Sequence, residues 1–152
     1  MSVHRIRLAG PWDYRWLSDD VHCSLGDFPR DIIPLEDATD RSGGSVKMPC
    51  DWTTLFGPRA GCASFKRKFH RPTNLESHER VAIQLTGVGG EGLIVLNGKT
   101  VLCFKEAKAV EVDVTESLRP FNTVDVLLRF VPEAEGKIGG LYDSVFLEIR
   151  SQ

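Results

Sequence analysis

The strongest constraint on the fold of this chain is the brevity of its apolar segments. Short runs of β-branched, aromatic and aliphatic residues recur along the 152 residues and are separated by glycine, proline, asparagine and aspartate. Within several runs apolar and polar residues alternate, as in a strand with one buried and one solvated face. No window of about 11 residues keeps the 3.6-residue apolar stripe of an amphipathic helix. The sequence therefore predicts an all-β fold.

The spacing of these segments predicts an antiparallel two-sheet jelly-roll β-sandwich. The predicted strands are Val3–Leu8, Trp12–Leu17, Val46–Met48, Ala63–Phe69, Arg80–Thr86, Leu93–Leu96, Thr100–Phe104, Val110–Val114, Val124–Val131 and Ser144–Ile149. In "CASFKRKFH", Ala63, Phe65 and Phe69 fall on one face, which Arg67 interrupts. Because a lone buried charge is costly, we expect Arg67 to form an ion pair.

The remaining segments are predicted to be turns and loops. In "TESLRPF" we expect one helical turn, with Thr115 as its N-cap, Leu118 pointing inward and Pro120 ending it. Residues 18–44 are rich in Asp, Pro, Gly and Ser and predict a long loop, with a helical turn at Pro34–Ala38 as an alternative. Such a loop covers a sheet edge or belongs to a binding face. By length, residues 1–152 are expected to form a single β-sandwich domain.

Charge and hydropathy exclude several classes of function. The formal net charge is -2, so no basic excess points to nucleic acid or to an anionic membrane as a partner. No run of about 18 apolar residues could span a bilayer. The N-terminus "MSVHRIRLAG" lacks the apolar core of a signal peptide. As written, the chain is expected in the cytoplasm, or elsewhere if a leader has been removed.

The cysteines and carboxylates identify no reaction centre. Cys23, Cys50, Cys62 and Cys103 contain no CxxC pair and no short spacing to a histidine, which argues against a zinc site. Cys62 and Cys103 lie in strand-like runs and are expected to be buried free thiols. No carboxylate spacing identifies an acid/base pair, and "GVGGEG" joins two strands as a turn rather than preceding a helix. We expect no metal, no cofactor and no catalytic residue.

Several blocks of sequence follow one another in a characteristic order. They are "RIRLAGPWDYRWL", "VKMPCDW", "ASFKRKFHRP", "VAIQLTGVGGEGLIVLNGKTV", "VEVDVTESLRPFNTVDVLL" and "GGLYDSVFLEI". In this order they resemble the sugar-binding N-terminal domain of glycoside hydrolase family 2, the family of β-galactosidases and β-glucuronidases. The resemblance extends from Ile6 to Ile149 and implies a galactose-binding-domain-like jelly roll.

The resemblance implies a non-catalytic module, because enzymes of that family carry their catalytic carboxylates on a separate barrel domain. The expected function is that of a carbohydrate-binding-like module whose ligand is a glycan or a sugar. One alternative is a protein-interaction or structural β-sandwich that docks a protein partner or forms a homo-oligomer. Another is a fragment or split subunit of a glycoside hydrolase.

One predicted loop supplies the first candidate ligand-binding residues. "CDWTTLFGPRAG" offers Asp51, Trp52 and Arg59 close together in sequence. Sugar sites place an aromatic face against the C–H surface of the ring and use a few polar groups for the hydroxyls. The alternative for Trp52 is packing beneath this loop.

Three further candidates come from other loops. Asn97 belongs to an Asn-Gly pair between two apolar runs, which predicts a type I′ hairpin turn. The matching asparagine of the resembling β-galactosidases lies close to the sugar, so a ligand role for Asn97 is the alternative. Tyr142 and Asp143 stand just before the last predicted strand and would edge the same rim as the "CDWTTLFGPRAG" loop.

Overall fold

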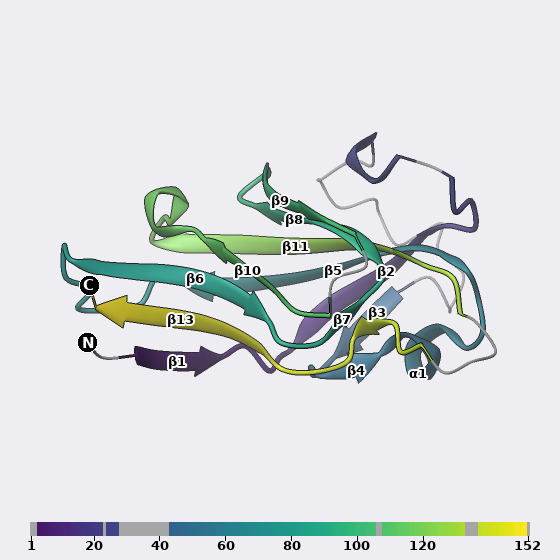
Figure 1. Ribbon diagram of the computed structural model, residues 1–152, viewed down its shortest axis with the longest axis horizontal. Coiled ribbons are helices and arrows are strands. Elements are labelled where there is room, and N and C mark those ends of the chain that lie inside the picture. The colour runs from purple at the N-terminus through teal and green to yellow at the C-terminus, as the bar shows by residue number, and fades with distance from the viewer. Residues whose placement is uncertain (1–2, 23, 28–42, 106–107, 133–136, 152) are drawn as a thin grey trace.

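The computed structural model describes residues 3–22, 24–27, 43–105, 108–132 and 137–151, and its strands form antiparallel sheets (Figure 1). The four-stranded sheet has the order β1 (Val3–Arg7), β13 (Val145–Ser151), β6 (Glu79–Leu85) and β10 (Val110–Asp113). The six-stranded sheet has the order β3 (Gly43–Val46), β2 (Trp12–Ser18), β5 (Gly61–His70), β11 (Phe121–Phe130), β8 (Glu91–Leu96) and β9 (Lys99–Phe104). The all-β antiparallel sandwich predicted from the sequence is confirmed.

A third, small sheet and three short helices complete the described part of the chain. The small sheet has the order β4 (Cys50–Asp51), β12 (Gly140–Leu141) and β7 (Val88–Gly89). The helices are the α-helix α1 (Trp52–Phe56) and the 3-10 turns η1 (Leu25–Asp27) and η3 (Thr115–Ser117). In Figure 1 α1 and β4 lie at the end of the sandwich opposite to the two chain termini. No helix in these residues is long and apolar enough to cross a membrane.

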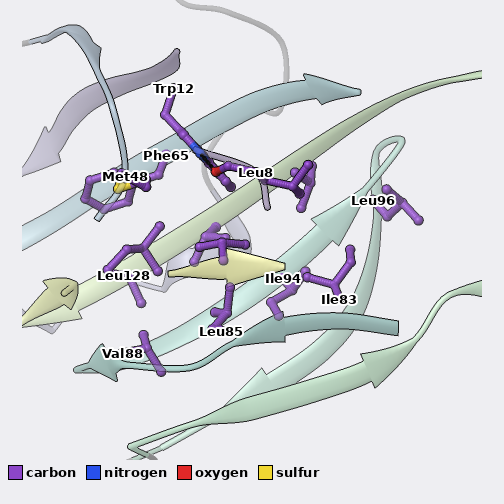
Figure 2. Packing of buried hydrophobic residues seen from close by; sticks show 14 of the residues in the cluster. Leu8, Trp12, Met48, Phe65, Ile83, Leu85, Val88, Ile94, Leu96 and Leu128 are labelled. Carbon is purple, nitrogen blue, oxygen red and sulfur yellow. Dashed lines mark hydrogen bonds between the residues drawn. The ribbon is translucent and has the colours of Figure 1, made fainter. Parts of the chain in front are cut away.

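The core lies between the two large sheets. Val124, Val126 and Leu128 alternate along β11 and are fully buried, as their spacing predicts. Figure 2 shows Ile83 and Leu85 of β6 in the same interior cluster as Leu128. Each such side chain stabilises the fold by about 1.5–3 kcal/mol on burial. Packing between two alternating faces therefore holds the sheets together.

Arg67 does not form the expected ion pair with any residue that the structure describes. Ala63, Phe65 and Phe69 are buried on the inner face of β5, as predicted. The guanidinium of Arg67 donates instead to the carbonyl oxygen of Lys68 (3.1 Å). Burial lowers the pKa of Arg67. Arg67 is half-buried, so one nitrogen of the guanidinium reaches a backbone carbonyl, while Nε is buried and has no hydrogen-bond partner among the described residues.

The turn at residue 115 is present, but its capping differs from the prediction. Thr115 is the first residue of η3, and the N-cap position belongs to Val114. The Oδ1 atom of Asp113 accepts hydrogen bonds from the amide and the hydroxyl of Thr115, at 3.0 and 2.7 Å. Thr115 Oγ1 in turn accepts from the amide of Val81 (2.8 Å), which ties the turn to β6. Leu118 packs against the core as expected.

Several boundaries differ because pairing partners decide where strands lie. The strand predicted at Val46–Met48 is observed as β3, which begins three residues earlier, at Gly43, and pairs with β2. β4 and β12 have two residues each, too few to show any alternation in sequence. The turn predicted in "GVGGEG" contains β7, which pairs with β12. The α-helix α1 lies in a segment predicted to be loop.

Two other expectations concern residues 18–44 and the thiols. Within residues 18–44 the structure describes η1, whereas the alternative turn at Pro34–Ala38 lies outside the described residues. Cys62 is buried, as predicted, and its thiol donates to the carbonyl oxygen of Asp20 (3.6 Å). The prediction for Cys103 is wrong, because Cys103 is an exposed free thiol on β9, which is an edge strand of the six-stranded sheet.

Candidate functional site

The small sheet brings most candidate residues to one end of the sandwich. In the pairing of β4 with β12, Asp51 lies opposite Gly140. Tyr142 and Asp143 follow β12 directly, and both of their amides point to the carbonyl oxygen of Gly87, at 3.0 and 3.3 Å. We call Asp51, Tyr142 and Asp143 the rim. The segments around Asp51, Gly87 and Tyr142, which are far apart in sequence, therefore meet there.

Trp52 lies beneath the rim rather than on it. Its side chain is fully buried, and its ring centroid lies 5.0 Å from that of Phe56 and 5.5 Å from that of Phe130. The indole N–H donates to the carbonyl oxygen of Arg59 (2.8 Å), so the polar atom of the ring is satisfied inside the protein. A ring without an exposed face cannot stack on a sugar. The structure thus places Trp52 in the packing role that was its alternative.

Arg59 is engaged by neighbours that sequence analysis did not associate with it. Its guanidinium lies 4.1 Å from the ring centroid of Trp16 and donates to Asp19 Oδ1 through Nη2 (2.8 Å) and Nε (3.2 Å). Trp16 Nε1 donates to the same oxygen (2.8 Å). The hydrogen bonds from Trp16 and then from Arg59 lower the pKa of Asp19. This triad anchors the loop after α1, and no local signal predicts it because Asp19 and Arg59 are 40 residues apart.

The rim residues keep polar groups within reach of solvent. Asp51 is half-buried, and the hydroxyl group of Thr54 in α1 donates a hydrogen bond to Asp51 Oδ1. The ring of Tyr142 covers Gly87, where an added Cβ would lie 2.7 Å from Tyr142 Cε1. Asp143 is exposed and accepts from the amide of Ser144 (2.7 Å). The rim therefore presents two carboxylates and a phenol close to one another.

Asn97 lies at the other end of the sandwich. Its φ of 51° and the φ of 83° at Gly98 are those of the predicted type I′ turn. Asn97 Oδ1 accepts from the amide of Thr123 (2.9 Å), and Nδ2 donates to Asn122 Oδ1 (3.0 Å). Thr123 is near the start of β11 and Phe130, which contacts Trp52, is at its end, roughly 20 Å away. The structure does not bring Asn97 to the rim.

A separate groove of about 470 Å³ opens beside η1. Its lining comes from Ser24, Leu25, Gly26, Glu91, Gly92, Leu93, Cys103, Phe104, Lys105 and Arg129. Glu91 accepts from Arg129 Nη1 (3.2 Å), and Lys105 Nζ lies 3.9 Å from its other oxygen. We call this site the η1 groove. None of these residues is predicted from the sequence to contact a ligand, because they come from four distant segments.

The side chains described at these sites include polar and charged groups rather than a cluster of metal ligands. Within the described residues, no group of three or more His, Cys, Asp and Glu side chains could hold a metal ion. The rim and the η1 groove instead present hydrogen-bond donors and acceptors at the surface.

Comparison with known proteins yields structural likeness only. No protein-family model matches the sequence. No curated protein matches it either.

Solved structures of similar fold include several glycosidases. An FMN-binding β-glucuronidase from Faecalibacterium prausnitzii L2-6 matches with a TM-score of 0.71 and 16% identity, over 97% of this chain and 22% of the enzyme. A β-glucuronidase from an uncultured Clostridium matches with 0.71 and 18%, over 99% of this chain and 29% of the enzyme. A putative β-galactosidase from Bacteroides fragilis matches with 0.68 and 17%, over 99% and 24% respectively.

The coverage defines the class to which the fold belongs. Nearly the whole chain corresponds to less than a third of each enzyme, so this chain has the fold of one part of such glycosidases. At these identities the likeness concerns the fold alone.

Proposed function

We propose that this chain is a non-catalytic carbohydrate-binding module, with the jelly-roll arrangement of the sugar-binding domain of family 2 glycosidases. The observation that carries the proposal is the coverage: 97–99% of this chain corresponds to only 15–32% of enzymes that include several β-glucuronidases. The motif order along the sequence points to the same family.

The geometry of the rim supports this function. The hydroxyl group of Tyr142 can both donate and accept a hydrogen bond. Asp51 and Asp143 can accept hydrogen bonds from sugar hydroxyls. In this proposal Trp52 supports the rim from the core and Arg59 anchors the neighbouring loop. Asn97 serves the hairpin at the far end.

Glycan binding can be tested on the purified chain. A glycan array followed by calorimetric titration should reveal a weakly bound sugar, and Asp51→Asn together with Tyr142→Phe should reduce the affinity for it at least about tenfold. Thr53→Ser, a conservative change of an exposed residue of α1, is the matched control. No response across the array would contradict the proposal. Hydrolysis of aryl glycosides by the purified chain would contradict its non-catalytic part.

A second candidate function is docking to a protein. Val131 and Ile138 are 48% and 55% exposed, and they flank the contact between Gly139 and the Phe130 ring. Exposed apolar side chains of this size are common at domain and subunit interfaces. A partner protein, a second copy or the remainder of a hydrolase could cover them.

Docking predicts a change in molecular size. Analytical ultracentrifugation should show a dimer, or a complex with a separately supplied hydrolase segment encoded next to this chain. The double substitution Val131→Asp and Ile138→Asp should dissociate that dimer or complex. A monomer that binds no such segment would leave glycan binding as the better account.

A further inference from the structure

The η1 groove exists because the outer side of the six-stranded sheet carries a second apolar cluster. Cys62, Val95 and Leu127 are buried together with Leu25 of η1. Leu93 packs partly buried against the same cluster and also lines the groove. The turn therefore covers part of the sheet and leaves an open hollow beside it. At about 470 Å³, the hollow is within the usual range of small-ligand sites.

The walls of the groove differ in chemistry. Leu25 and Leu93 form an apolar side, whereas the ring of Phe104 belongs to the interior cluster on the opposite face of the sheet. Glu91, together with the two cations that surround it, forms a charged side. A sugar ring has the same division, with C–H groups on its faces and hydroxyl groups around its edge. The groove is thus amphipathic in the way that a saccharide requires.

The charged side favours a neutral ligand over an anion. Glu91 is already shared by Arg129 and Lys105, whose side chains are 20% and 79% exposed. An anion would have to approach the Glu91 carboxylate and compete with it for both cations. Adjacent hydroxyl groups can instead donate to Glu91 and accept from Lys105 without breaking the ion pair.

We propose that the η1 groove binds a neutral saccharide unit, with Glu91 and Lys105 contacting adjacent hydroxyls and the apolar side contacting the ring. This site is separate from the rim and does not depend on a ligand binding there. The two sites involve different elements, since the rim belongs to the small sheet and the groove to β8, β9, β11 and η1.

Cys103 provides a direct reporter, because its thiol is exposed and lines the groove. The rate of its alkylation by iodoacetamide, followed by peptide mass mapping, should fall at least about fivefold with saturating lactose or cellobiose. Cys50 lies in β4 next to the rim and is half-buried, so its alkylation rate reports on the rim in the same experiment. Burial raises the pKa of the Cys50 thiol, so its basal rate is expected to be slower.

Variants then locate the contacts. Glu91→Gln keeps the size of the side chain. It should raise the sugar concentration that is needed to protect Cys103 by about tenfold. Lys105→Met changes an exposed side chain and should weaken it as well, without a risk to folding. Asp51→Asn at the rim is the matched control and should leave protection of Cys103 unchanged.

The outcomes separate this inference from glycan binding at the rim. Protection of Cys103 that depends on Glu91 and Lys105 supports the groove, whatever happens at the rim. Protection of Cys50 alone, abolished by Asp51→Asn, overturns the groove and leaves the rim proposal standing. No protection of Cys103 by any neutral disaccharide overturns the groove. Protection by sodium phosphate or glucuronic acid but not by neutral disaccharides also overturns it, because the site would then select anions.

Discussion

The outer faces of the two large sheets are completed in opposite ways. On the four-stranded sheet, Glu148 is 3% exposed and accepts hydrogen bonds from Arg5 (3.0 Å), Arg150 and Gln84 (2.7 Å). Arg150 and Gln84 also donate to Glu111. On the six-stranded sheet, the corresponding position is taken by the apolar cluster beneath η1. One face is covered by its own charged side chains; on the other, η1 lies over an apolar cluster, beside the ion pair of Lys66 and Asp125 (3.5 Å).

The difference shows what decides where a sheet needs a cover. Buried polar groups are tolerated when each finds partners, and neighbouring strands of a sheet can supply those partners. Apolar side chains are stabilised only when they are removed from water, so another segment of chain must lie over them. A covering segment has edges, and the η1 groove lies at such an edge.

The largest effect is expected from Leu127→Ala, which removes the centre of the apolar face. Leu127 is 5% exposed and belongs to the cluster with Leu25 and Val95. The free energy of unfolding should fall by about 3 kcal/mol, through lost burial and a residual cavity. Urea unfolding followed by tryptophan fluorescence measures this. Thr123→Ala on the same strand is the control, and an equal loss there would contradict the importance of the cluster.

Leu25→Ala tests the cover itself. Leu25 is 6% exposed in a short turn that can partly relax, so we expect a loss of about 2 kcal/mol. Cys62, which is fully buried beneath the cover, should become alkylated faster. Mass mapping of Cys62 in the variant and the unaltered protein measures this exposure. An unchanged rate would mean that η1 does not protect the apolar face.

On the charged face, Glu148→Gln should destabilise the fold by about 1 kcal/mol at neutral pH. Burial alone raises the pKa of Glu148, but hydrogen bonds from Arg5, Arg150 and Gln84 outweigh it and lower the pKa overall. The carboxylate therefore contributes stability above its unfolded-state pKa of about 4.3, and this contribution is lost as pH falls through the lower folded pKa.

Urea unfolding of the unaltered protein and of the Glu148→Gln variant, from neutral pH to below about pH 4.3, measures the contribution of Glu148. The difference in stability should stay constant from neutral pH to about pH 5 and shrink below about pH 4.3. A difference that does not change with pH would show that size, and not charge, matters at this position.

The smallest effect is expected from Arg80→Met, at the exposed edge of the charged face. Arg80 donates to Asp113 (2.9 and 3.0 Å) and to Glu116 (2.6 and 2.8 Å). The hydrogen bonds from Arg80 lower the pKa of Glu116. Exposed pairs of this kind are screened by salt, so the small loss should vanish at about 1 M NaCl. Thermal unfolding at low and high salt, with exposed Lys99→Met as control, measures it. A loss that persists in salt would indicate a packing role.

Much of the sandwich is predictable because strand alternation is a local property. The inner faces of β5 and β11 and the Asn97–Gly98 turn follow from a two-residue period and from the backbone angles that a hairpin turn demands. The two-residue strands β4, β7 and β12 carry no such period, and α1 is too short to show a helical one. Elements of this kind form only when distant partners are in place.

The candidate site was less predictable for the same reason. Asp51, Trp52 and Arg59 are close in sequence, yet Trp52 is in the core, Arg59 is held by Asp19 and Asp51 alone reaches the rim. Proximity in sequence does not indicate which side chains share a surface. Burial depends on what packs above a residue, and this comes from other parts of the chain.

The amino-acid sequence by itself determined the class of this protein: an all-β sandwich with a hairpin at Asn97–Gly98, whose motifs resemble those of a glycosidase domain. The tertiary structure alone decided which polar groups stay exposed and where the surface is hollowed. Gly140 lies opposite Asp51, and Arg129 reaches Glu91. These contacts depend on strand order and register, which bring together residues that no local pattern connects.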